Sequence, residues 1–328
     1  MGACRLILVV GGAGYIGSQV VKLLVNTEQV IVYDNLSTGH REVVAEHAIF
    51  VQGDIRDEVK LTQLFSLFPI DAVFHFASAC SAEESVPNPA HYYENNVGAT
   101  LHLLKVMRAY KVNKMIYSST AAIYQPIAQG LLHEESTISP VNPYGRSMRM
   151  VEQILEDYAA AYDFQCTVLR YFNVAGVDAF AQNGDSHAPE THLIPLVLRH
   201  LYGETETVQI YGDDYDTADG TYIRDYLCVA DLAKAHILAF EALMMEQKPF
   251  TIYNVGNERG YSVKEIIQLC EQVTQKKATI EIAKRRNGEP AQLIASAKKI
   301  RQALGWEAEK DLHIMVEHVW NWHLLQKY

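Results

Sequence analysis

The sequence has little that would suit a membrane span, a nucleic-acid surface or a metal centre. Its longest apolar runs have the length of a strand, far short of a helix that could cross a bilayer. The 28 Lys and Arg residues are outnumbered by 39 Asp and Glu, and no local basic patch relieves the net charge of −11. The 13 histidines show neither H-E-x-x-H nor another paired ligand spacing. We therefore expect no membrane, no nucleic-acid partner and no metal.

Cysteine is also scarce, and its spacing is irregular. The five cysteines form no C-x-x-C pair, and three lie in or beside apolar runs, which favours free thiols in a reducing compartment. An apolar run begins as early as Leu6, which leaves no room for a signal peptide, so we expect a cytoplasmic protein. The 49% hydrophobic and 20% charged residues are typical of a globular chain, and 328 residues suffice for one large or two modest domains.

The stretch Val9–Gln19, VVGGAGYIGSQ, has the features of a dinucleotide-binding turn. An apolar run, Leu6–Val10, precedes it, and apolar residues at helical spacing follow it. Its glycines satisfy both G-x-G-x-x-G and G-x-x-G-x-x-G, and they are Gly11, Gly12, Gly14 and Gly17. Free amides at a helix N-terminus attract a pyrophosphate, and missing Cβ atoms let it approach. A second strand, Val30–Tyr33, ends at Asp34, which is placed to hydrogen-bond an adenosine ribose.

Strand-like and helical patterns continue to alternate after Asp34. The further strands that we expect are Ala48–Gln52, Ala72–Ala77 and Lys114–Ser119, with a long helix over Tyr92–Tyr110. This alternation predicts an α/β fold with a doubly wound parallel sheet of the Rossmann type, whose ligands bind beyond the carboxyl ends of the strands. Asp54 follows one strand and could meet an adenine amino group there.

The pattern changes from Asn173 onward. The stretch 174–190 is polar and poor in strands, and 203–225 is acidic and rich in glycine, although no register matches a calcium loop. A helix over Val229–Met245 and a strand over Phe250–Val255 follow, and 262–328 is mostly helical. We expect a dinucleotide-binding domain over 1–173, rejoined by about 226–255, and a smaller, interleaved C-terminal α/β domain over 174–328.

Three short segments carry groups suited to alcohol–ketone chemistry. They are Ser118–Thr120 after a strand, Asn142–Met148 at the start of a helix, and Tyr171–Asn173 at the end of the next strand. A phenolate can take a hydroxyl proton while the carbon loses hydride to a nicotinamide, and a neighbouring hydroxyl steadies the oxygen.

At these residues the chain resembles the UDP-glucose 4-epimerase family of the extended short-chain dehydrogenase/reductase superfamily. The resemblance runs from about Arg5 to Trp322, and its segments are GGAGYIGS, YDNLSTGH, GDIRD, HFAS, SSTAAIY, NPYG, RYFNVAG, ETHLIPLVL, GDDYDTADGTYIRDY and the Arg285–Arg286 pair before Gly288-Glu289. It implies an isomerase that keeps NAD bound, oxidises C4 of a UDP-hexose, lets the keto sugar rotate and returns hydride to its other face.

The resemblance also implies a role for individual residues. Tyr144 corresponds to the catalytic base, and Thr120 to the hydroxyl that assists it. The implied NAD-binding residues are Gly11, Gly14, Tyr15, Ile16, Gly17, Asp34, Asn35, Asp54, Ile55, Phe76, Ala77, Asn95, Thr120, Tyr144 and Phe172. The implied UDP-sugar residues are Asn173, Leu193, Tyr211, Arg224, Arg286 and Glu289. Arginine suits a diphosphate because its planar fork donates bidentately, although Arg224 beside Asp225 could also form a surface ion pair.

The resemblance further implies a homodimer, formed through the helices over 92–110 and 144–162. A twofold dimer is the commonest assembly of soluble proteins. The side chains that we expect on these helix surfaces are aromatic enough for an interface, and they are Tyr92, Tyr93, Met107, Tyr158 and Tyr162.

The chain departs from the family at the catalytic lysine. The family pattern is Y-x-x-x-K, and here Met148 stands in place of the lysine that holds the nicotinamide ribose and lowers the tyrosine pKa. Arg146 and Arg149 lie on other faces of the helix and would be the first candidates to supply a charge. Other departures are Gln125 for a glycine, Cys228 for a histidine, Cys80–Glu84 for a glycine-rich turn, and Glu289 for an aspartate.

These departures leave two classes of function open. One is an epimerase impaired by the loss of its lysine, and the other is a non-catalytic paralogue that binds NAD and UDP-sugar as a sensor or partner subunit. Another UDP-sugar modifier, a dehydratase or decarboxylase, ranks last because no acid or base follows the SST segment in the way those enzymes require.

Overall fold

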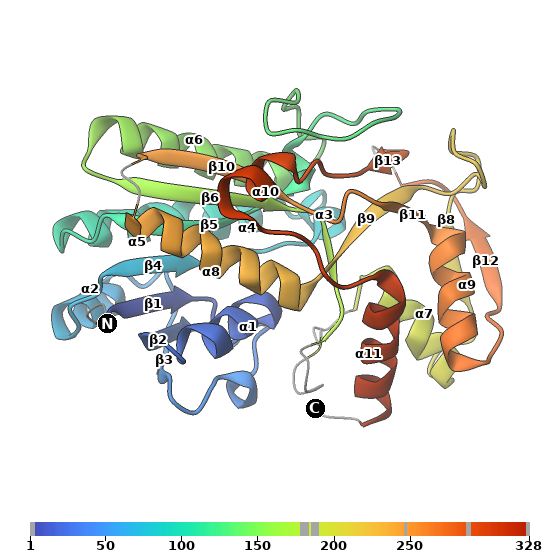
Figure 1. Ribbon diagram of the computed structural model, residues 1–328, viewed down its shortest axis with the longest axis horizontal. Coiled ribbons are helices and arrows are strands. Elements are labelled where there is room, and N and C mark those ends of the chain that lie inside the picture. The colour runs from blue at the N-terminus through green and yellow to red at the C-terminus, as the bar shows by residue number, and fades with distance from the viewer. Residues whose placement is uncertain (1–3, 178–183, 185–189, 246–247, 287–289, 326–328) are drawn as a thin grey trace. The chain divides into compact units, whose positions relative to one another are not determined.

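The computed structural model of the protein describes residues 4–177, 184, 190–245, 248–286 and 290–325 (Figure 1). The chain folds into two compact units. Unit 1 comprises Met1–Ile123, Pro140–Arg170 and Ala233–Tyr253, and unit 2 comprises Tyr124–Ser139, Tyr171–Leu232 and Asn254–Tyr328. The sequence reading placed 124–139 in the dinucleotide-binding domain, whereas hydrogen bonds such as Leu132 N to Ile294 O, 2.8 Å, attach this segment to unit 2.

A sheet of seven strands forms the centre of unit 1 among the described residues. In chain order its strands are β1 (Leu6–Val10), β2 (Gln29–Asp34), β3 (Ile49–Gln52), β4 (Ala72–His75), β5 (Lys114–Thr120), β6 (Gln165–Tyr171) and β10 (Phe250–Val255). Their spatial order is β10-β6-β5-β4-β1-β2-β3, from orange β10 at one edge to blue β3 at the other (Figure 1). The pairs β1–β2, β1–β4, β2–β3 and β4–β5 are parallel. The doubly wound sheet is thus confirmed, and the strand predicted over Phe250–Val255 does return to it.

Helices connect these strands, as the alternating pattern predicts. They are α1 (Tyr15–Leu24), α2 (Glu58–Leu67), α3 (Ala82–Ser85), α4 (Pro89–Tyr92), α5 (Ala99–Ala109), α6 (Pro143–Ala161) and α8 (Val229–Met245), with 3-10 turns at Arg41–Val43 and Ala121–Ile123. The predicted helix over Tyr92–Tyr110 is interrupted, because a π-helical turn, Tyr93–Gly98, joins α4 to α5. Such turns occur frequently at functional sites.

Unit 2 contains, among the described residues, a four-stranded sheet, a two-stranded sheet and four helices. Its strands are β7 (Asn173–Ala175), β9 (Ile223–Cys228), β11 (Gly260–Ser262) and β13 (Gln292–Leu293) in one sheet, and β8 (Val208–Tyr211) with β12 (Ile280–Ala283) in another. Its helices are α7 (Leu193–Tyr202), α9 (Val263–Thr274), α10 (Lys298–Leu304) and α11 (Leu312–Leu324). Val197, Ile266 and Met315, one from each of α7, α9 and α11, are fully buried in one core cluster with Tyr226 and Cys228 of β9.

Local sequence signals set where several helices begin. Ser262 and Glu265 form a reciprocal capping box at the start of α9. Asn142 caps α6 by accepting a hydrogen bond from Gly145 N at 2.8 Å, and Pro143 occupies the first turn, where its missing N–H costs nothing. Among the described residues, no helix combines the length and apolarity that a bilayer crossing requires.

Candidate active site

The glycine-rich turn between β1 and α1 leaves space for an anion at the start of the helix. Gly11 has a positive φ of 78°, and a Cβ there would lie 2.7 Å from Ala77 N, so this position requires glycine. A Cβ on Gly17 would overlap the carbonyl oxygen of Gly11, so glycine is needed there for close packing. A Cβ on Gly14 would meet, among the described residues, nothing closer than Gly11 O at 3.4 Å.

This difference between the glycines fits a bound pyrophosphate. Helix α1 begins at Tyr15 and Ile16, and its N-cap, Gly14, has no side chain that could cap the first amides. The missing Cβ of Gly14 leaves space at the positive end of the helix, where an anion would bind. The turn can accordingly hold the dinucleotide that the sequence predicts.

Asp34 joins the end of β2 to the glycine turn. Its side chain is buried, and the two carboxylate oxygens accept hydrogen bonds from Ala13 N at 2.9 Å and Leu36 N at 2.8 Å. Each carboxylate oxygen can accept a second bond, so ribose hydroxyls could still bind. Asp34 thus lies at the end of β2, as the sequence predicts, and the two backbone N–H groups fix the orientation of its carboxylate.

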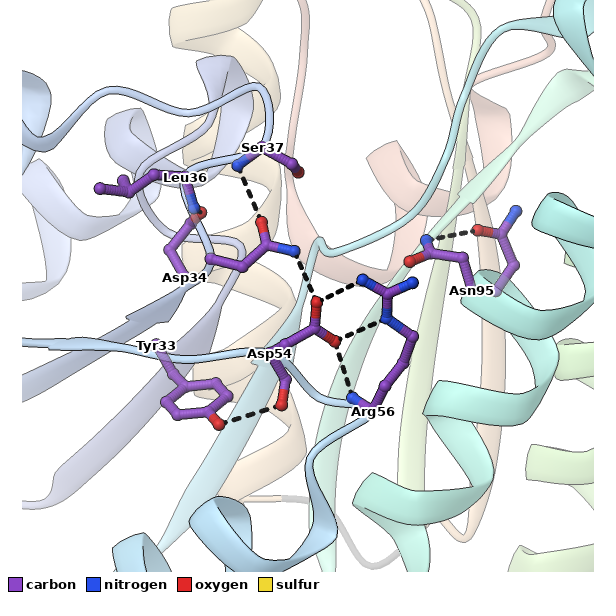
Figure 2. A network of polar contacts seen from close by, with 9 residues as sticks. Tyr33, Asp34, Leu36, Ser37, Asp54, Arg56 and Asn95 are labelled. Carbon is purple, nitrogen blue, oxygen red and sulfur yellow. Dashed lines mark hydrogen bonds and ion pairs between the residues drawn. The ribbon is translucent and has the colours of Figure 1, made fainter.

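Asp54 is more heavily engaged than the sequence suggests (Figure 2). Arg56 donates to it from Nε at 2.9 Å, Nη2 at 2.6 Å and the backbone N at 2.8 Å, and Asn35 Nδ2 donates at 2.8 Å. Hydrogen bonds from the Arg56 guanidinium and from Asn35 hold the pKa of the Asp54 carboxyl well below its usual range. Because a carboxylate has about four acceptor sites, an adenine amino group would have to displace Arg56 or Asn35. Ile55, the next residue, is buried.

A buried asparagine fastens the segment that follows β4. Asn96 Oδ1 accepts from Ala79 N at 2.8 Å, and Asn96 Nδ2 donates to Ala79 O at 3.0 Å and to Ser147 Oγ at 3.0 Å. Asn95 donates to the same Oδ1 at 3.1 Å. Asn96 therefore ties the segment containing Phe76 and Ala77 to α6.

Thr120 and Tyr144 come from elements that touch each other. Thr120 ends β5, and its hydroxyl accepts from Ala122 N at 3.1 Å. A Cβ on Gly145 would overlap the carbonyl oxygen of Ala122, so the start of α6 lies directly against the turn after Thr120. Ser147 Oγ also donates to Tyr144 O at 2.7 Å. The predicted base and its assisting hydroxyl thus belong to neighbouring parts of unit 1.

The side chain in the lysine position is buried in unit 1. Met148 is 1% exposed, and its sulfur accepts from Tyr117 Oη at 3.4 Å and from Asn96 Nδ2 at 3.8 Å. The two arginines nearby are directed elsewhere. Arg149 Nη1 pairs with Glu152 at 3.1 Å, and Arg146, which is exposed, donates to Val141 O at 3.4 Å.

The Cys80–Glu84 segment ends in α3, close to the tyrosines. Tyr92 Oη donates to Glu84 Oε2 at 3.3 Å, and burial together with the Glu84 charge raises the pKa of Tyr92 to about 12. The Tyr92 ring meets that of Tyr144 edge-on, with centroids 6.3 Å apart. The acidic segment is therefore connected to the candidate base through one aromatic ring.

The predicted UDP-sugar residues lie in unit 2. Asn173 begins β7, Leu193 begins α7 and Tyr211 ends β8, while Phe172 precedes β7 and is buried. Arg224 is 4% exposed and Asp225 is fully buried, so the surface ion pair considered for them is wrong. Arg286 stacks on the Tyr211 ring at 4.1 Å, and Glu289 lies outside the described residues.

The adjacent residues Arg224 and Asp225 have other partners. Arg224 Nη2 donates to Pro290 O at 2.9 Å. Burial raises the pKa of Asp225 to about 7, against three backbone N–H groups that donate to it from Asn257, Glu258 and Ala295. Both side chains therefore hold loops of unit 2 in place.

Sequence reasoning missed two groups of supporting residues. Arg56 follows Asp54 by two residues, so its pairing could have been found from GDIRD alone. The network around Glu152 could not, because two of its three partners, Ser119 and Arg170, are distant in sequence. This fully buried carboxylate accepts from Ser119 Oγ at 2.6 Å, Arg170 Nε at 2.9 Å and Nη2 at 2.8 Å, and Arg149.

Comparison with known proteins identifies the family. Residues 7–256 match the model of the "NAD dependent epimerase/dehydratase family". The chain is 48% identical to a UDP-glucose 4-epimerase of Halalkalibacterium halodurans, over 97% of this chain and 95% of that protein. A crystal structure of a UDP-glucose 4-epimerase is 44% identical with a TM-score of 0.94, covering 98% of each chain. That of the Bifidobacterium longum enzyme with NAD+ and UDP is 36% identical with a TM-score of 0.93, covering 98% and 99%. The chain belongs to the NAD dependent epimerase/dehydratase family.

Proposed function

We propose that the protein is an NAD-dependent UDP-hexose 4-epimerase that interconverts UDP-glucose and UDP-galactose, with catalysis weakened at Met148. The observation that carries the proposal is the placement of Tyr144, whose helix begins against the turn that follows Thr120. The glycine turn of the same unit has the open Gly14 position that a pyrophosphate needs. Relatives of up to 48% identity over nearly the whole chain are UDP-glucose 4-epimerases, which supports this substrate.

The residues of unit 1 would act on the 4-hydroxyl of the hexose. Tyr144 takes the hydroxyl proton as a phenolate and returns it to the sugar oxygen after the keto sugar has turned over. The Thr120 hydroxyl donates a hydrogen bond to that oxygen and steadies its charge. When bound, NAD supplies the acceptor and donor of hydride. The implied NAD-binding side chains keep the roles given above, except that Asp54 would act mainly by fixing Asn35 and Arg56.

The implied substrate residues suit a nucleoside diphosphate. Arg224 and Arg286 offer planar hydrogen-bond donors for the phosphates, and the Arg286 guanidinium stacks on the aromatic ring of Tyr211. Asn173 and Leu193 would contact the sugar nucleotide, with Glu289 at the uridine ribose. We propose a UDP-sugar as the small-molecule substrate, and neither a nucleic acid nor a membrane as a partner.

Met148 is the reason to expect weak catalysis. A phenol without a neighbouring cation has a pKa of ~10, so about one in a thousand is ionised at pH 7. Arg149 is paired with Glu152 and Arg146 with a backbone carbonyl, so neither directs its charge to Tyr144 through these contacts. Positioned acid–base catalysis contributes ~10²–10⁴-fold, and the loss should fall in that range. The second candidate, a non-catalytic protein that binds NAD and UDP-sugar, is favoured by this same feature.

One experiment distinguishes the two candidates. The purified protein is assayed for coupled turnover of UDP-galactose from pH 6 to pH 10, and its NAD content is measured after denaturation. An impaired epimerase shows a slow rate that rises with pH as Tyr144 ionises and that Met148→Lys increases at neutral pH. Bound NAD and UDP-sugar without turnover in either protein would instead establish the binding paralogue.

The choice of cofactor rests on Asp34. Its charge would repel a 2′-phosphate, whereas it can accept hydrogen bonds from a free 2′-hydroxyl. We therefore expect NAD(H) to copurify with the protein. Recovery of NADP(H) alone would contradict this assignment.

We further propose a homodimer through α5 and α6, working in the cytoplasm. Two residues expected at the interface are in fact buried within unit 1, since Tyr92 and Met107 are 0% exposed. The apolar side chains that are at least 40% exposed here include Leu101 on α5, Met150 on α6 and Tyr162 directly after α6. A monomer by light scattering would exclude the dimer.

The state of the cysteines bears on the proposed cytoplasmic location. All five cysteines are free thiols, which supports a reducing compartment.

A further inference from the structure

Met148 is surrounded by hydrogen-bond donors rather than by apolar side chains alone. Its sulfur faces the Tyr117 hydroxyl at 3.4 Å and the Asn96 amide nitrogen at 3.8 Å. Both partners are buried, with Tyr117 2% and Asn96 1% exposed. A thioether is a weak acceptor and has no proton to donate. The two buried donors around residue 148 therefore suit a side chain that accepts hydrogen bonds, as the methionine sulfur does.

The two donors differ in whether they can also accept a hydrogen bond from the side chain at position 148. Asn96 cannot turn its amide around, because Oδ1 already accepts from Ala79 N and Nδ2 donates to Ala79 O and Ser147 Oγ. The Tyr117 hydroxyl can rotate about its C–O bond and can donate or accept. Tyr117 is thus the group that can hold either a thioether or an ammonium at position 148.

The backbone explains why Tyr117 reaches α6. Tyr117 and Ser119 alternate onto the same face of β5, and they contact Met148 and Glu152, which lie one helical turn apart on α6. Thr120, the next residue, points to the opposite face of the strand. The ring of His75 lies beside Tyr117 with centroids 5.6 Å apart, and burial lowers the pKa of His75 to about 4, so this histidine is neutral at pH 7.

We propose that Tyr117 is a positioning residue that keeps the side chain at position 148 directed into the core, and that Tyr117 and Met148 function as a pair. The inference deepens the proposed function, on which its kinetic consequence rests. A lysine at position 148 would find the Tyr117 oxygen as an acceptor on the core side. Its ammonium would then divide between that oxygen and the direction of Tyr144 and the cofactor ribose. Restoring the lysine alone therefore restores only part of the lost rate, and removal of the Tyr117 hydroxyl restores the rest.

Six proteins test the pairing without any need for turnover. They are the parent, Met148→Leu and Met148→Lys, each with and without Tyr117→Phe. Their urea unfolding is followed in the same excess of NAD, and the NAD dissociation constant of each protein is measured so that the contribution of cofactor binding can be subtracted. Leucine is the matched control because it fills a similar volume without an acceptor. Tyr117→Phe should increase the unfolding constant about threefold more in the parent than in Met148→Leu, as expected of a weak hydrogen bond. In Met148→Lys, Tyr117→Phe should increase the unfolding constant about tenfold or more beyond its effect in Met148→Leu, because the hydrogen bond between the ammonium and the Tyr117 oxygen is charge-assisted.

Equal effects of Tyr117→Phe in the parent, in Met148→Leu and in Met148→Lys would overturn the pairing. The UDP-galactose assay then measures the consequence in the four proteins that carry methionine or lysine at position 148. The double variant Met148→Lys with Tyr117→Phe should have a kcat at pH 7 about tenfold or more above that of Met148→Lys alone. Its rate should also begin to rise at a lower pH. Equal rescue with and without Tyr117→Phe would overturn the positioning role.

The two readouts separate this inference from the proposed function. If no variant turns over, the proposed epimerase function fails, while the unfolding measurements still decide the pairing. If the proteins that carry Met148→Lys do not fold, the comparison of the parent with Met148→Leu decides it.

Discussion

Replacing Glu152 with alanine should destabilise the protein more than any exposed charge change of the same kind. The Glu152 carboxylate is fully buried and receives hydrogen bonds from Ser119, Arg149 and Arg170, the last through two nitrogens at 2.9 and 2.8 Å. Arg170 is itself only 1% exposed, so the variant would leave a guanidinium buried without its carboxylate. Breaking a buried ion pair from one side costs about 3–5 kcal/mol, a large share of a typical folding free energy of about 5–15 kcal/mol.

The network also carries a consequence for the site. Ser119 immediately precedes Thr120, and Glu152 lies on the helix that begins beside Tyr144, so the carboxylate fixes β5 against α6. Ser119→Ala should cost about 1–3 kcal/mol, because it removes a single charged hydrogen bond. Combined with Glu152→Ala it should add less than that, because both changes break one network.

Urea unfolding followed by circular dichroism measures these differences. Glu307→Ala is the control, since Glu307 is 67% exposed and pairs with Arg301 at 3.1 Å. An exposed pair of this kind contributes about 1 kcal/mol or less. If Glu152→Ala were no more destabilising than Glu307→Ala, or if Ser119→Ala added its full cost to Glu152→Ala, the reasoning about the network would be refuted.

Two further predictions concern the glycine turn and a buried histidine. With NAD removed from each protein, Gly14→Ala should unfold at the same urea concentration as the parent, because a Cβ there has room among the described protein atoms, yet it should no longer bind NAD. Gly17→Ala should lower both the urea midpoint and the NAD affinity, since its Cβ would overlap Gly11 O. Equal stability of the two variants would contradict the distinction. His75, whose pKa burial lowers to about 4, binds fewer protons folded than unfolded, so it destabilises the fold as pH falls from about 6.5 to about 4. The unfolding free energy of His75→Gln should therefore fall by about 3 kcal/mol less between pH 7 and pH 4 than that of the parent. An equal fall in the two proteins would contradict this assignment.

Elements with a strong local pattern could be predicted from the sequence. The buried run Leu6–Val10, the glycine turn and Asp34 at the end of β2 lie where the pattern places them, because local spacing dictates strand, turn and helix. The helices Pro143–Ala161 and Val229–Met245 and the returning strand Phe250–Val255 also follow from periodicity. The glycine turn follows β1 and Asp34 ends β2, so both lie at the carboxyl edge of a parallel sheet, where ligands bind.

Contacts between distant residues were decided only by the tertiary structure. Arg149 could have served Tyr144, but the fold brings Glu152, Ser119 and Arg170 together, and the arginine pairs there. Met148 could be recognised as a lost lysine, yet no spacing predicts that Tyr117, 31 residues earlier, donates to its sulfur. Local patterns record backbone periodicity and turn geometry, whereas the partner of a buried polar group depends on which elements become neighbours. The sequence alone therefore predicted the fold and the candidate reacting groups, and the tertiary structure determined which contacts hold those groups in place.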